Sequence, residues 1–130
     1  MTLDVRHPRD MTRRTAVEEL LAKAESIADR RGLKCSWTVK MDEPAVPMDE
    51  RLTAFLTAAM EVTGLPPKIM ASGAGHDAMV MAGRMPAAML FLRSPGGISH
   101  SPGESVLEED VEASLRVGEI FLRRMTAEAN

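Results

Sequence analysis

Two glycine-rich loops in this sequence each carry a histidine. The first, SGAGHDA, contains Gly75 and His76, and the second, SPGGISHSPGE, contains His100 and Glu104. The helix start expected after the first loop offers backbone N–H groups, which favour an anion or a developing oxyanion. A neutral imidazole oriented by a nearby polar group is the usual form of a zinc or manganese ligand. The loops therefore suggest one shared site, and the ordinary alternative is two exposed histidines in turns.

The chain offers few residues to complete such a site. A mononuclear metal centre needs three or more protein ligands, whereas the only histidines are His7, His76 and His100. The sequence contains no HExxH, CxxC, G-x-S-x-G or P-loop motif. Its single cysteine, Cys35, lies in an alternating pattern typical of packing, excludes an internal disulfide and suits a reducing cytoplasm. We interpret His7 as turn structure.

The first part of the chain predicts a β-α-β unit. Residues 2–6 alternate apolar and polar side chains, as do residues 33–40, where Cys35, Trp37 and Val39 would face inward. Between them a 3.6-residue period predicts a helix from Met11 to Arg31. Asp10 is the expected N-cap and Gly32 the expected end of this helix. This arrangement is typical of a sheet with one face in water.

The second part predicts buried α/β structure. The proline-containing segment 41–49 is the expected linker, so we divide the chain into residues 1–46 and 47–130. Helices are expected over 49–63 and 109–125, and strands over 68–72 and 87–92. The last helix would present an apolar stripe of Val111, Leu115, Gly118, Leu122 and Met125. Both histidine loops follow expected strands, and ligands bind beyond the carboxyl ends of strands in open α/β sheets.

Composition indicates an ordinary globular protein. Of its 130 residues 45% are hydrophobic and 27% charged, and the formal net charge of −3 suggests no nucleic-acid partner. No apolar run is long enough to span a membrane. The 11 methionines are interpreted as core filling. Two strands and one helix in residues 1–46 are too few to bury their apolar faces alone, so a further chain or segment is expected there.

The stretch SGAGHDAMVMAGRMPAAMLFLRSPGGISHSPGESVLEEDV resembles the C-terminal part of the catalytic domain of M20-type amidohydrolases. The group it resembles contains N-carbamoyl-L-amino acid hydrolases, β-ureidopropionases and allantoate amidohydrolases. LDVRHPRD and VPMD are similar to the end of that family's dimerisation (lid) domain and its return to the catalytic domain. The implied fold is α/β, with residues 1–46 as the second half of a lid β-α-β unit. Residues 47–130 would then form the C-terminal part of an α/β metallohydrolase catalytic domain.

The resemblance also implies roles for particular residues. His100 matches the last ligand of a site for two divalent ions, which are zinc, manganese or cobalt. His76 and the Gly75 backbone match the catalytic groups that contact substrate and stabilise the tetrahedral intermediate. Arg6 matches the arginine that clamps a substrate carboxylate, which in the family reaches the partner subunit's active site. The implied enzyme is a cytoplasmic homodimer that joins through the lid domain and hydrolyses a small carbamoyl or ureido carboxylic acid.

The resemblance further implies an incomplete site. The other metal ligands and the general-base glutamate of the family lie in an N-terminal segment that has no counterpart here. We therefore expect the sequence to be a C-terminal fragment of a longer enzyme, inactive alone. The alternative is a non-catalytic chain that self-associates, or one half of a split enzyme. An ordinary M20 peptidase is disfavoured because such enzymes usually carry threonine at the position of His76.

Overall fold

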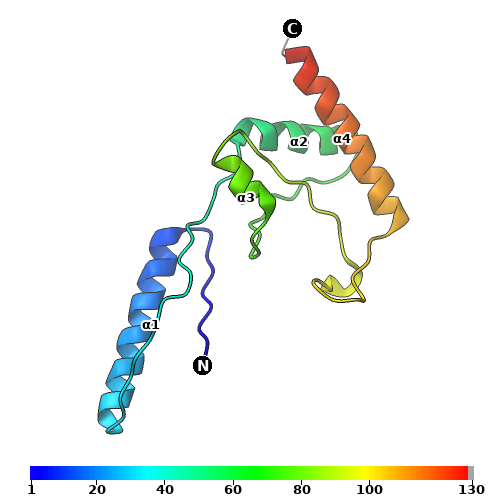
Figure 1. Ribbon diagram of the computed structural model, residues 1–130. Helices are drawn as coiled ribbons and strands as arrows, with labels where there is room; N and C mark the ends of the chain where they lie inside the picture. The colour runs from blue at the N-terminus through cyan, green and yellow to red at the C-terminus, as the bar shows by residue number, and fades with distance from the viewer. Residues whose placement is uncertain (129–130) are drawn as a thin grey trace. The chain divides into compact units, whose positions relative to one another are not determined.

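A computed structural model of the chain describes residues 1–128 and shows two compact units (Figure 1). Unit 1 comprises Met1–Val46 together with the short segment Ala71–Gly75. Unit 2 comprises Pro47–Met70 and the residues from His76 onward. Each unit has its own helices and its own internal hydrogen bonds.

Unit 1 is built on one long helix. Helix α1 spans Asp10–Arg30, which confirms the predicted helix with its bounds shifted by one residue. After it, Gly32 adopts a left-handed φ of 63°, and the Leu33 N–H donates to the Ala28 carbonyl over 2.9 Å. This is the Schellman arrangement that commonly ends helices at glycine. The predicted helix end is therefore confirmed together with its physical cause.

The start of α1 differs from the prediction. Arg9, not Asp10, is the N-cap residue, and its side chain makes no capping hydrogen bond. Asp10 is instead the first helical residue, and its carboxylate accepts a hydrogen bond from the Ala45 N–H over 3.1 Å. Arg13 donates to the same carboxylate over 3.3 Å and pairs with Asp42 over 2.6 Å. The acidic residue therefore attaches the segment after residue 41 to the helix instead of capping it.

The predicted strands of unit 1 are not observed. The structure assigns no β-strand within residues 1–128, so residues 2–6 and 33–40 have no ladder to join. The side chains predicted to face inward are exposed, namely those of Cys35, Trp37 and Val39. A β-strand is defined by hydrogen bonds to a neighbouring strand. An alternating pattern can indicate one buried face, but it does not provide the second strand that must pair with it.

Unit 2 begins with a well-capped helix. Helix α2 spans Glu50–Val62, and the Asp49 carboxylate accepts a hydrogen bond from the Leu52 N–H over 2.8 Å. This confirms the predicted helix, whose end is marked by Gly64 at a φ of 77°. The Asp49 N–H also donates to the Ala87 carbonyl over 2.8 Å. The same residue therefore caps α2 and connects it to the apolar segment 87–92.

Helix α4, spanning Glu108–Glu128, packs on α2 and forms the core of unit 2 (Figure 1). The predicted stripe of α4 is partly confirmed, because its members Val111, Gly118 and Met125 are half-buried. It is wrong at Leu115 and Leu122, which are 69% and 61% exposed, whereas Val117 is 1% exposed. The observed face runs through Ser114 and Val117. Ser114 is tolerated there because its hydroxyl donates to the Val111 carbonyl over 2.8 Å. The buried side chains of this core are those of Leu52, Phe55, Ala59 and Val117.

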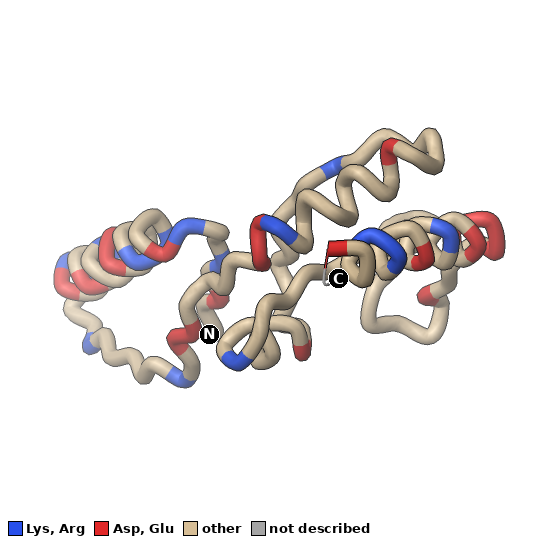
Figure 2. The backbone as a smooth tube through the Cα atoms, turned by 90° about the horizontal axis from the view of Figure 1, so that it is seen from above, with Lys and Arg blue, Asp and Glu red and all other residues tan. Residues whose placement is uncertain are grey.

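Two short helices complete unit 2. Helix α3 spans Asp77–Ala82, and the 3-10 helix η1 spans Pro95–Gly97. Figure 2 shows that α1 and α4 each carry both acidic and basic positions. In the described part of the chain, no helix combines the length and apolar character needed to cross a bilayer.

The methionines do not fill the core as predicted. The side chains classed as buried within residues 1–128 are Ala28, Leu52, Phe55, Ala59 and Val117, and none of these is methionine. Exposed methionines occur in both units, at Met11, Met41, Met70, Met81 and Met85. Methionine is flexible and adaptable, but on these helices the closely packed positions are occupied by smaller or more rigid side chains.

Candidate functional site

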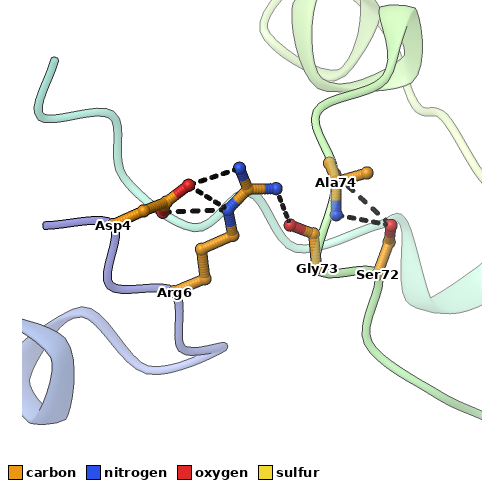
Figure 3. A network of polar contacts seen from close by, with 5 residues as sticks. All are labelled: Asp4, Arg6, Ser72, Gly73 and Ala74. Atoms are coloured by element: carbon orange, nitrogen blue, oxygen red, sulfur yellow. Dashed lines mark hydrogen bonds and ion pairs between the residues drawn. The ribbon is translucent and has the colours of Figure 1, made fainter. Parts of the chain in front are cut away.

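Arg6 lies against the loop that leads to Gly75, within unit 1 (Figure 3). Its Nη1 donates to the Gly73 carbonyl over 2.5 Å. The Asp4 carboxylate accepts from Arg6 Nε over 3.0 Å and from Nη2 over 2.7 Å. The loop is itself turned by Ser72, whose hydroxyl oxygen accepts from the Ala74 N–H over 3.1 Å. The structure therefore places the predicted carboxylate-binding arginine beside the first glycine-rich loop.

Asp4 orients the Arg6 guanidinium without occupying all of it. The hydrogen bond from Arg6 lowers the pKa of the Asp4 carboxyl, and the same bond raises the pKa of Arg6. Both side chains are about 60% exposed, so the pair contributes orientation more than stability. Arginine has five N–H donors, and three of them are used by Asp4 and Gly73. One N–H on each terminal nitrogen therefore remains to meet a carboxylate.

His76 directly follows Gly75 in the sequence and is the first residue after the loop to belong to unit 2. It is the N-cap residue of α3, and its carbonyl accepts from the Met79 N–H over 2.9 Å. Its half-buried ring contacts Phe91 edge to face, with centroids 5.6 Å apart and ring planes at 61°. This geometry is a favoured aromatic pairing. His76 is therefore packed against the apolar segment that leads toward the second histidine loop.

His100 is exposed and has an uncommon backbone conformation. Its φ is 54°, the one positive value for a non-glycine residue among those the structure describes. Its N–H donates to Glu104 Oε2 over 2.8 Å, and the Glu104 N–H donates to the Ser101 carbonyl over 2.9 Å. The sequence offered Ser99, Ser101 and Glu104 as nearby polar groups to orient the imidazole of His100. The observed contact is instead with the His100 main chain.

An ion pair joins the segment before the second loop to the first turn of α4. Arg93 directly precedes this loop, and its guanidinium contacts Asp110 at two points, Nε to Oδ2 over 3.0 Å and Nη2 to Oδ1 over 2.5 Å. The hydrogen bond to Asp110 raises the pKa of Arg93. Sequence analysis missed this pair. The available signal was an arginine at the end of an apolar segment, followed by the acidic first turn of α4.

The described residues do not fit a divalent-metal site by themselves. Within residues 1–128 no three His, Cys, Asp or Glu side chains converge closely enough to hold an ion. His100 provides one exposed imidazole, and its neighbour Glu104 is committed to a backbone amide. His7 accepts a hydrogen bond from the Arg9 N–H over 3.0 Å and so serves a turn. Among the described residues, His100 therefore lacks the companion ligands that a divalent ion needs.

Comparison with known proteins establishes the family. Residues 7–124 match the model of peptidase family M20/M25/M40. This match covers most of the chain, including both histidine loops. The chain therefore belongs to this family, and the resemblance drawn from the two loops is confirmed.

Individual relatives give a narrower group. The chain is 42% identical over 122 residues to an allantoate deiminase of Arabidopsis thaliana, which covers 87% of this chain and 23% of the relative. It is 34% identical over 124 residues to an allantoate amidohydrolase of Escherichia coli (strain K12), covering 95% and 30%. An N-carbamoyl-L-amino-acid amidohydrolase of Pseudomonas sp. (strain NS671) is 32% identical over 116 residues, covering 89% and 28%. The chain spans about a quarter of the length of these relatives.

Proposed function

We propose that this chain provides substrate-binding and transition-state residues for hydrolysis of a linear amide C–N bond in a carbamoyl or ureido carboxylic acid. The substrate class is an N-carbamoyl amino acid or allantoate, in keeping with the names of the relatives. The observation that carries the proposal is Arg6, oriented by Asp4, bound to the glycine-rich loop and retaining two N–H donors. A guanidinium edge of this kind is suited to bidentate recognition of a carboxylate.

Each candidate residue has a distinct role in this proposal. Arg6 binds the substrate carboxylate and so fixes the position of the scissile bond. The Gly75 N–H and the His76 imidazole polarise the carbonyl oxygen and stabilise the oxyanion that forms when water attacks. By family resemblance, His100 would be a ligand to zinc, manganese or cobalt, completed by donors outside these 130 residues. The edge-to-face contact with Phe91 supports the His76 role, because it restricts the imidazole before substrate binds.

The same proposal includes the architecture of the intact enzyme. Residues 1–46 are the second half of a lid and dimerisation domain, and residues 47–130 are the C-terminal part of an α/β catalytic domain. Residues 2–6 and 33–40 then become strands when the rest of the lid sheet is present to pair with them. The exposed side chains of Trp37, Val39 and Met41 support this assignment, because they would be covered in such a sheet or in a homodimer.

Steady-state kinetics of Arg6 variants test the substrate role. Ammonia release from allantoate and from N-carbamoyl amino acids is measured for the complete enzyme that contains this chain. Arg6→Ala is expected to raise KM by about 10- to 100-fold, because a charge-assisted bidentate contact is lost. Arg6→Lys should recover only part of this loss, because an ammonium group cannot reproduce the fork. A substrate whose carboxylate is replaced by a neutral amide should show little difference between the variants.

The matched control is Arg116→Ala, which removes an exposed arginine from α4. It should leave KM for every substrate unchanged. The proposal is refuted if Arg6→Ala leaves KM for the carboxylate substrates unchanged, or if the neutral substrate loses as much as the carboxylate one. His76→Asn should lower kcat with a smaller effect on KM, since its contact is proposed to strengthen in the transition state.

A second candidate function is a non-catalytic chain that associates with copies of itself. The observation that favours it is the exposed apolar run in unit 1, where Leu33, Trp37, Val39 and Met41 are open to solvent. Sedimentation velocity of the 130-residue chain distinguishes the two candidates. A discrete, concentration-dependent dimer with no hydrolysis in the complete protein would favour association, whereas hydrolysis that depends on Arg6 would favour the enzyme.

A further inference from the structure

His100 is held in a conformation that its own side chain disfavours. A φ of 54° brings the Cβ of an L-residue close to the following carbonyl, so glycine normally occupies this region. In the described chain the remaining positive φ values all belong to glycines, including Gly96 and Gly97 of the same loop. A histidine kept in this state needs surrounding contacts that determine its backbone.

Glu104 provides the principal contact of this kind. Its Oε2 accepts from the His100 N–H over 2.8 Å, which is a charge-assisted hydrogen bond to the main chain. Its own N–H donates to the Ser101 carbonyl over 2.9 Å. The segment from His100 to Glu104 is therefore closed by two hydrogen bonds, one through a side chain and one through the backbone. The carboxylate returns to the residue four positions before it.

The neighbouring part of the loop is fixed independently. The Gly97 N–H donates to the Ser94 carbonyl over 2.9 Å, and the Ser94 hydroxyl donates to the Ile98 carbonyl over 2.7 Å. The Ile98 side chain lies near Gly96 and Gly103, where an added Cβ would be 3.7 Å and 3.9 Å from it. His100 is thus the position at which two ordered turns meet. The direction of its Cα–Cβ bond follows from the backbone at that junction.

We infer that Glu104 is a positioning residue that holds His100 in its left-handed conformation and so sets the direction in which the side chain leaves the main chain before any ligand binds. This inference concerns the loop of the chain itself. It rests on the proposed function only for what the imidazole then does. Unlike the roles of Arg6 and His76, it requires no contact between Glu104 and substrate.

The test is NMR of the ¹⁵N-labelled full chain, with the His100 amide as the reporter. Glu104→Ala should accelerate hydrogen exchange of this amide by about 3- to 10-fold, because its acceptor is lost. The φ-sensitive backbone coupling of His100 should change with it. Glu104→Gln keeps an acceptor oxygen at the same reach, so it should restore most of the protection. The matched control is Glu108→Ala, which removes an exposed carboxylate from the start of α4 and should leave the His100 amide unchanged.

A double-mutant cycle separates positioning from general stabilisation. If Glu104 acts by holding a disfavoured backbone, Glu104→Ala should cost the amide of residue 100 less protection from exchange when His100→Gly is also present. The reason is that glycine tolerates this φ. Unchanged exchange and coupling in Glu104→Ala would overturn the inference. So would failure of Glu104→Gln to restore the protection. An equal loss of protection on Glu104→Ala with His100 and with His100→Gly would overturn it as well. None of these readouts uses hydrolysis, so failure of the proposed function would leave this result unaffected, and the reverse holds as well.

Discussion

Replacing Phe55 with alanine should remove much of the stability of unit 2. Phe55 is 5% exposed and lies in the contact between α2 and α4. The guanidinium groups of Arg51 and Arg124 lie over its ring, with their Cζ atoms 5.5 Å and 4.8 Å from the centroid. A phenylalanine-to-alanine change in a core costs about 3–5 kcal/mol. Domains of ordinary stability have only about 5–15 kcal/mol in total, so this loss is a large fraction.

The measurement is urea unfolding followed by far-ultraviolet circular dichroism. Phe55→Leu retains apolar contact but loses the ring, so it should cost about 1–2 kcal/mol, with part of that from the cation–π contacts. Leu115→Ala is the matched control, because this leucine is 69% exposed and its removal should stay within about 0.5 kcal/mol. A loss below about 1 kcal/mol for Phe55→Ala, or a larger loss for Leu115→Ala, would refute the observed packing face of α4.

The remaining predictions concern helix ends and acid stability. Gly32→Ala should destabilise the chain by about 1 kcal/mol in urea unfolding, because Gly32 has a φ of 63°. Gly118→Ala should stabilise it by about 0.5–1 kcal/mol in the same assay, because a Cβ on this α4 glycine would meet nothing within 4 Å. The Ala45 N–H lowers the pKa of Asp10, so the folded state favours its carboxylate. That contribution is present above the ordinary aspartate pKa and is lost below about pH 4, as pH falls through the lowered folded value. An Asp10→Asn variant should therefore show a shallower decline of melting temperature on acidification, and an unchanged slope would contradict this role.

The helices could be predicted because their signals are local. Asp49 precedes α2 as its cap, and Gly32 and Gly64 follow helices at positive φ, so the bounds were correct to within a few residues. Strand pairing depends on residues distant in sequence, and alternation in residues 33–40 did not specify a neighbour. The predicted α4 stripe was wrong at Leu115 and Leu122, because the buried face of the helix instead includes Ser114, whose hydroxyl is satisfied by a carbonyl one turn earlier.

The candidate site was predictable in its residue types more than in its contacts. The alternation of residues 2–6 already placed Asp4 and Arg6 on one face, which is the pair that the structure shows. Glu104 was recognised as a neighbour of His100, but its partner atom depends on the turn geometry of the loop, which spacing alone does not define. The family match confirms the resemblance, and the roles of Arg6, Gly75, His76 and His100 remain predictions for the kinetic and NMR experiments.

The distribution of methionine has a consequence for oxidative damage. Solvent-accessible thioethers, such as those of Met11, Met41 and Met85, are the ones that peroxide converts to sulfoxide. The tightly buried positions between α2 and α4 hold leucine, phenylalanine, alanine and valine, which do not undergo this reaction. Mild oxidation therefore adds oxygen to the surface of the chain while the hydrophobic contact between the two helices stays chemically intact. The exposed methionines would thus be oxidised without altering the packed contact between α2 and α4.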